Sequence, residues 1–219
     1  HIDHCGRLPL LRKRGYRGPI YCNPAGRDLV RILLADSATM QERDAERENR
    51  KRRRDGGRRP VEPLYTLDDA LDVQQQFRSV RYGQVVEVLP GVELTFRDAG
   101  HILGSTSVWL TLREGPLERR LAFSGDLGQY DSPILRDPEP GPGADLVVME
   151  STYGDRLHRD TEATLEEFGA ILRGARRDGG NVMIPAFAVG RSQEILYQLA
   201  THFDEWQLGD WQVFLDSPM

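Results

Sequence analysis

Apolar and polar side chains alternate with a period of two in the middle of the chain, a pattern typical of β-strands. Val108, Leu110 and Leu112 follow this period, and both faces of their strand are expected to be covered. Residues 146–149 are apolar throughout and predict a buried strand, as do residues 182–184. Strands are predicted at residues 19–22, 84–89, 92–97, 107–112, 120–123, 146–149, 182–184 and 211–215.

Four segments place apolar residues three and four positions apart and predict helices. The first begins at Asn23-Pro24, where the missing proline N–H is harmless. The second opens with a capping box from Thr66 to Asp69, with Asp in place of Glu. The expected apolar faces are Leu29, Ile32 and Leu33; Leu67, Ala70, Leu71 and Phe77; Leu165, Phe168, Ile171 and Leu172; and Ile195, Leu196 and Leu199. The order of the predicted elements, with strands first and then strands and helices in alternation, predicts an α/β fold with a large mixed sheet.

Residues 37–62 are very polar. From Arg43 to Arg59 there are nine Arg or Lys and four Asp or Glu, a net charge of +5; because the whole chain carries −5, the remainder carries −10. We expect a solvated or partly disordered basic connector, although residues 37–54 would also permit a helix that ends at Gly56-Gly57. A basic block on an acidic body leaves nucleic-acid binding open.

Length and composition exclude several classes of protein. The chain has 219 residues, of which 39% are hydrophobic, and no apolar run approaches the roughly 20 residues of a membrane helix. Two cysteines, Cys5 and Cys22, cannot form a disulfide scaffold, and the start does not resemble a signal peptide. We therefore expect a cytoplasmic protein without a membrane partner. The sequence begins without Met and ends abruptly, so we also expect an internal fragment of a longer protein.

The first four residues hold three potential metal ligands, His1, Asp3 and His4. Imidazole nitrogen and carboxylate oxygen are ligands that Zn²⁺ accepts. A helix would put His1 and His4 on one face, whereas a tight loop would send the side chains to two sides and serve two ions. On its own the cluster is equally compatible with a solvated chain end.

Three further acidic or histidine residues follow predicted strands. His101 lies between two glycines, Asp126 follows Phe123-Ser124-Gly125, and Glu150 ends an apolar run. Taken singly, His101 is explained equally well as a histidine in a turn, without a metal. Taken singly, Asp126 is likewise explained as an aspartate that stabilises a turn. A buried Glu150 needs a partner, and it would either orient a ligand histidine or carry a proton. Together the three turns predict one site at a sheet edge. The two other histidines, His158 and His202, are expected at the surface.

The motifs together resemble the metallo-β-lactamase superfamily, and specifically its β-CASP branch of RNA-processing nucleases, which includes the pre-mRNA 3′-end cleavage subunit and its prokaryotic homologues. The motifs are residues 1–6, 99–105, 123–128, 149–154, 184–191 and 215–219. The resemblance implies a partial αββα sandwich, truncated at both ends, over residues 1–209. It also implies that a β-CASP domain begins at 210–219.

The resemblance further implies a centre of two Zn²⁺ ions. One ion would take His1 and His101 with Asp126, and the other would take Asp3 and His4 with Asp126. Asp3, Asp126 and Glu150 are then the catalytic residues. The first histidine of the family motif and the later ligand histidines fall outside the chain, so the fragment alone is expected to be inactive.

The expected activity is metal-dependent hydrolysis of RNA phosphodiesters by a hydroxide that two zinc ions activate. Ser151, Thr152 and Arg191 are candidates for holding phosphate, with the alternative that Arg191 is a surface charge at a helix N-terminus. A non-catalytic RNA-binding scaffold and a small-molecule hydrolase remain alternatives. RNA is the expected partner, single-stranded nucleic acid more generally is not excluded, and a homodimer is left open.

Overall fold

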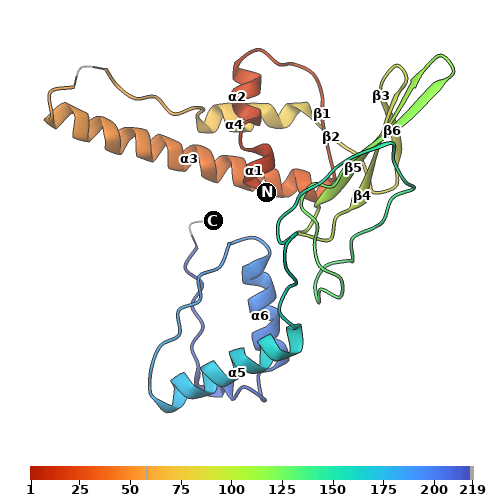
Figure 1. Ribbon diagram of the computed structural model, residues 1–219. Helices are drawn as coiled ribbons and strands as arrows, with labels where there is room; N and C mark the ends of the chain where they lie inside the picture. The colour runs from red at the N-terminus through yellow and green to blue at the C-terminus, as the bar shows by residue number, and fades with distance from the viewer. Residues whose placement is uncertain (58, 218–219) are drawn as a thin grey trace.

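The computed structural model describes residues 1–57 and 59–217, and it has an α/β fold (Figure 1). Its larger sheet has the strand order β3-β4-β5-β6-β7, where only the β6–β7 pair is parallel. The strands are β3 (Val85–Leu89), β4 (Val92–Asp98), β5 (Thr106–Glu114), β6 (Leu117–Phe123) and β7 (Leu146–Val148). Their positions confirm five predicted strands. Period-two patterning, which matches the pleat of a sheet, predicted β5, whereas a continuous apolar run predicted β7.

A helical layer precedes this sheet in the chain. It contains α1 (Ile2–Cys5), α2 (Leu8–Lys13), α3 (Pro24–Arg54), α4 (Leu67–Asp72) and the 3₁₀ helix η1 (Val73–Gln76). The parallel strands β1 (Ile20–Cys22) and β2 (Phe77–Ser79) join it. Leu34, Ala38, Tyr65 and Val73 form its buried core. The two layers are adjacent because Tyr21 packs against the core of the larger sheet.

Helix α3 is longer than the expected first helix, because residues 37–54 continue it instead of forming an unstructured connector. The Asn23 side chain accepts a hydrogen bond from the Ala25 N–H and caps its start, as the Asn-Pro pair predicts. Beyond residue 37 the helix is anchored by Ala45, which is buried, and by Asn49, which exchanges two hydrogen bonds with the backbone of Val61. The returning chain therefore provides the packing that the polar sequence did not indicate.

The predicted capping box of α4 is confirmed, but its predicted apolar face is wrong. Thr66 and Asp69 make both capping bonds. Leu67 and Leu71 are exposed, whereas Ala70 is buried. The helix is short and passes into η1, so Phe77 lies in strand β2 rather than on the helix.

The last third of the chain forms a separate lobe around α5 (Thr161–Arg177), α6 (Arg191–Thr201) and η2 (Leu208–Asp210), drawn in cyan to blue in Figure 1. Its core holds Leu172, Trp206 and Leu208. Gly169 lets α5 approach this core, since a Cβ there would lie 2.4 Å from Trp206 Nε1. Both helices match their predicted positions, although Ile171 and Leu196, expected to face inward, are exposed.

Within the described residues, two predicted strands are missing and a third is not buried as predicted. Residues 182–184 and 211–215 form no strand. Strand β7 forms, but Leu146, Val147 and Val148 are each about half exposed. Apolar sequence makes a buried strand only where a neighbouring strand and a covering layer are both present, and β7 has one neighbour, β6. The last two residues of the 215–219 motif, Pro218 and Met219, lie outside the described residues.

Among the described residues, no helix combines the length and the hydrophobicity needed to cross a bilayer.

Candidate metal centre

The first residues form a helical turn that presents two imidazoles together. His1 is the N-cap of α1, and its carbonyl accepts a hydrogen bond from the His4 N–H at 3.1 Å. The ring centroids of His1 and His4 are 4.6 Å apart. Buried Cys5 stabilises the turn, because its thiol donates a hydrogen bond to the His1 carbonyl at 3.2 Å. Of the two geometries that the sequence left open, the structure adopts the helix.

Burial raises the pKa of the Cys5 thiol, which keeps it protonated near neutral pH. The observed contact of Cys5 is its hydrogen bond to the His1 carbonyl, which supports the turn that carries His1 and His4.

His101 lies in the loop after β4, and the polar residues around it hold that loop. Ser105 Oγ accepts hydrogen bonds from the N–H groups of His101 and Ile102, at 3.1 and 3.3 Å. The Tyr82 hydroxyl donates to the Ser105 carbonyl at 2.8 Å, and Asp98 accepts from the Gly100 N–H. Burial raises the pKa of Tyr82 to about 12, so the hydroxyl stays a donor. These contacts fix the backbone that carries the imidazole.

The His101 loop also packs directly on the start of α3. Gly104 has a φ of +82°, and a Cβ there would lie 2.3 Å from the Gly26 nitrogen. Only glycine satisfies both the left-handed backbone and this close approach. The loop is therefore held between the sheet and the first turn of the long helix.

Asp126 lies in the loop after β6, and Glu150 holds that loop. Glu150 Oε1 accepts a hydrogen bond from the Leu127 N–H at 2.6 Å. In return, Ser124 Oγ accepts from the Glu150 N–H at 3.1 Å. The observed contact of Glu150 is thus with the backbone next to Asp126, which makes it a positioning residue for that carboxylate. The sequence analysis considered that Glu150 orients a ligand histidine or carries a proton, whereas its observed partner is the Leu127 backbone.

The two carboxylate oxygens of Asp126 face different imidazoles. Oδ2 contacts His1 Nε2 and lies 3.7 Å from His101 Nε2. Oδ1 lies 3.2 Å from His4 Nε2. The turn at the chain start and the two loops after β4 and β6 therefore converge on one carboxylate, as the sequence predicts for a shared sheet-edge site.

Three of these residues bring together donor atoms of the kinds that a metal ion accepts. One donor atom from each of His1, His101 and Asp126 lies within 4.8 Å of the other two. Donors to a single Zn²⁺ ion, at about 2.0–2.2 Å from it, are about 3–4 Å apart, so a shift below about 1 Å would suffice.

Asp3 lies outside this group of three. Its side chain is 77% exposed, and its Oδ2 lies 3.6 Å from His1 Nδ1, the ring nitrogen that faces away from Asp126. This contact is longer than a hydrogen bond. In the described geometry Asp3 contacts His1 and makes no ion pair with another described residue.

The predicted phosphate-binding residues make no hydrogen bond or ion pair with the described histidines or with Asp126. Ser151 and Thr152 follow Glu150 and are exposed, and neither hydroxyl has a hydrogen-bond partner among the described residues. Arg191 is paired with Glu194 at 2.8 Å on the first turn of α6. That turn begins beside the His101 loop, because a Cβ on Gly190 would lie 3.1 Å from Ile102.

The loop supports Ser105, Tyr82 and Asp98 were not identified from the sequence as functional residues. Ser105 and Asp98 lie within four residues of His101, and this proximity is the one sequence feature that could have identified them. Tyr82 has no such feature. His158 is exposed, as predicted. His202 is only partly exposed, since it stacks on Trp206 with ring centroids 4.4 Å apart.

The chain is similar along its length to curated proteins with RNA-related names. It is 40% identical over 219 residues to ribonuclease TTHA0252 of Thermus thermophilus, a match that covers 100% of this chain and 45% of that protein. It is 32% identical over 226 residues to the transcription termination factor FttA of Cenarchaeum symbiosum, covering 99% of this chain and 32% of the factor.

The FttA of Thermococcus kodakarensis is 34% identical over 204 residues, with 91% of this chain and 29% of that factor covered. No family model matches the chain. The chain spans less than half the length of these relatives.

Proposed function

We propose that this chain carries the metal centre of an RNA-cleaving nuclease of the metallo-β-lactamase superfamily, β-CASP branch. The observation that carries the proposal is the division of three imidazoles between the two oxygens of Asp126. Oδ2 would serve one Zn²⁺ ion with His1 and His101. Oδ1 would serve a second ion with His4, and the family resemblance assigns Asp3 to that ion. The names of the relatives, a ribonuclease and transcription termination factors, support RNA as the substrate.

The ions, when bound, would activate water as a nucleophile near neutral pH and neutralise charge on the phosphate. Asp126 holds the site together because its two oxygens reach ligands from α1 and from the His101 loop. Glu150 fixes the backbone at Leu127 and thereby orients the Asp126 carboxylate. The free hydroxyls of Ser151 and Thr152 would donate to phosphate oxygens beside the centre.

Arg191 would take the same phosphate through its planar guanidinium, which matches two anionic oxygens. It would exchange its pairing with Glu194 for the phosphate. That exchange costs little because the Arg191 side chain is 63% exposed and the ion pair is screened by water.

The test combines metal content with RNA cleavage, measured on the full-length protein rather than on this chain alone, which is expected to be inactive. Wild type is compared with Asp126→Ala and with Asp204→Ala, an exposed acidic residue in the other lobe. Zinc is counted by mass spectrometry, and cleavage is followed on end-labelled RNA. We expect bound zinc and cleavage in wild type and in Asp204→Ala.

In Asp126→Ala we expect zinc affinity and RNA cleavage to fall by more than the roughly 10–100-fold that is typical when a residue behind a metal ligand is removed. Zinc without RNA cleavage would contradict the proposal and favour a small-molecule hydrolase. A protein that binds RNA but neither cleaves it nor holds zinc would favour the non-catalytic scaffold.

A further inference from the structure

The C-terminal half of α3 carries five cations on one face. At about 100° of rotation per residue they fall within an arc of about 100°. Leu34, Ala38 and Ala45, which are buried, lie on the opposite side of the same helix. We call these five residues the cationic stripe: Arg43, Arg47, Arg50, Lys51 and Arg54.

Most of the stripe is not neutralised. All five side chains are exposed. Arg50 approaches Glu46 at 3.9 Å, and this is the only ion pair of the stripe with a described residue. Arg52, on another face of the helix, is by contrast paired with Glu48 at 2.8 Å. Four cations therefore face solvent without a partner in the part of the chain that the structure describes.

Helix stability does not explain this arrangement. Cations in the last turn interact favourably with the free carbonyls there, which accounts for Lys51 and Arg54. Arg43 and Arg47 lie further inside the helix, and like charges four residues apart, as in Arg43, Arg47 and Lys51, repel one another. The rest of the chain outside the basic block is acidic, so the stripe is not part of a generally basic surface. An anionic ligand would remove the repulsion.

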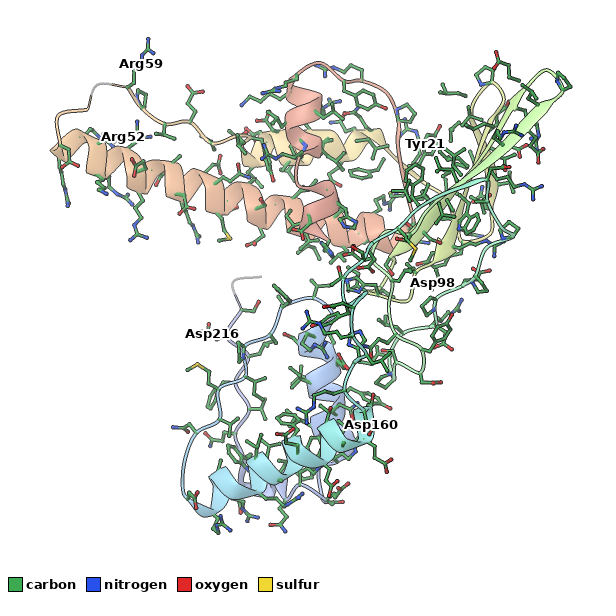
Figure 2. All side chains as sticks on the ribbon, viewed as in Figure 1. Tyr21, Arg52, Arg59, Asp98, Asp160 and Asp216 are labelled. Carbon is green, nitrogen blue, oxygen red and sulfur yellow. The ribbon has the colours of Figure 1, made fainter. Side chains whose placement is uncertain are left out.

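The stripe lies away from the metal centre but on an element that begins there. The first turn of α3 contacts the His101 loop through Gly26, and the stripe follows about 25–40 Å further along the helix axis. Figure 2 labels Arg52 near the far end of α3 and Asp98 at the end of β4. The segment after α3 returns along the side opposite the stripe, where Asn49 binds Val61. The stripe is therefore left open to a ligand.

We infer that the cationic stripe binds the sugar–phosphate backbone of the RNA strand whose cleavage site lies at the metal centre. The inference rests on the proposed RNA substrate. The residues from 43 to 59 include no aromatic side chain. Base stacking is therefore not available there, and the contact is electrostatic and independent of sequence. Four of the five stripe side chains, all except Arg43, also line a shallow hollow of about 560 Å³ together with Asp44 and Glu48.

The test is a binding measurement that does not depend on cleavage. The triple variant Arg47→Gln, Lys51→Gln, Arg54→Gln keeps good helix formers in place. The matched control is Arg14→Gln, Arg119→Gln, Arg177→Gln, which removes three other exposed cations. Fluorescence anisotropy with EDTA present gives the Kd for labelled oligouridylates of about 40 and about 5 nucleotides over a range of KCl concentrations.

For the long RNA we expect a Kd at least tenfold higher in the stripe variant. The slope of log K against log salt should fall by about 2, since three phosphate contacts on a single strand contribute about 0.7 each. The short RNA should bind both variants alike. Equal slopes for the stripe variant and its control would overturn the inference, as would an equal loss for short and long RNA. The binding measurement does not depend on cleavage, so the two proposals can fail separately. If the protein holds no zinc but its RNA binding still depends on the cationic stripe, the proposed nuclease function is refuted and the inference about the stripe is kept.

Discussion

Gly128→Ala should separate the two loops that carry His101 and Asp126. A Cβ at Gly128 would lie 1.7 Å from the Gly100 carbonyl oxygen and 2.7 Å from the His101 nitrogen. Both are backbone atoms, so no side-chain rotation relieves the overlap. Gly128 does not have a positive φ, and the effect is therefore one of close approach rather than of backbone strain.

The magnitude follows from that overlap. Ordinary contacts of a Cβ begin at 3.4 Å, so the loops must move apart by about 1.5–2 Å. The Gly128 N–H bond to the Ala99 carbonyl, now 2.8 Å, is then lost. Overpacking of about 1–3 kcal/mol and a lost hydrogen bond of about 1 kcal/mol together destabilise the protein by about 2–4 kcal/mol.

The effect on the metal centre should be larger than this loss suggests. His101 Nε2 and Asp126 Oδ2 are 3.7 Å apart and would move beyond the reach of one ion. Because metal–ligand distances tolerate only about 0.2 Å, we expect zinc affinity to fall by about 10–100-fold or more. Urea unfolding gives the stability, and a chelator-competition titration of the folded protein gives the zinc affinity.

The control is Gly174→Ala on α5, where an added Cβ meets no atom within 4 Å. It should stabilise the protein by about 0.5–1 kcal/mol and leave zinc affinity unchanged. A Gly128→Ala protein that is folded and binds zinc within twofold of wild type would refute the packing of these two loops.

Two further predictions follow from side chains that bind backbone groups. Glu150→Gln should keep zinc affinity within about threefold, because the amide oxygen still accepts the Leu127 N–H, whereas Glu150→Ala should lower it about tenfold; equal affinities in a zinc titration of the two variants would argue against a positioning role. The Thr66 N–H holds the pKa of Asp69 below its usual range, so the capping box stabilises the fold above about pH 4, and this contribution is lost as the pH falls further. Asp69→Asn should therefore cost about 1 kcal/mol in urea unfolding at pH 7 and much less at pH 3; the same cost at both pH values would exclude this assignment.

The sequence predicted local structure well wherever the signal lies within a few residues. The Thr66–Asp69 capping box and the Asn23 cap are local backbone interactions, and both are present. Strands β3 to β6 lie where the sequence predicts them, and period-two patterning marks β5 in particular. The same reasoning failed for residues 182–184 and 211–215, since an apolar run does not specify the neighbour that a strand requires.

The candidate site likewise combines features that the local sequence predicts with features that only the folded chain shows. The residue types at positions 1, 4, 101 and 126, together with the resemblance, indicated a metal site before any geometry was known. The role of Tyr82 was not apparent, because its hydrogen bond joins it to a loop that is near it only in the folded chain. The extension of α3 through residue 54 likewise depended on packing against Val61 and Tyr65.

The sequence by itself determined which ligands are available and in what order, because ligand chemistry belongs to the side chain. It also determined the basic block, because charge does not depend on the fold. Only the tertiary structure decided that Asp126 turns one oxygen to His1 and His101 and the other to His4. That arrangement requires three distant segments to meet, and their approach is set by close backbone packing at Gly26, Gly104 and Gly128, which no single segment encodes.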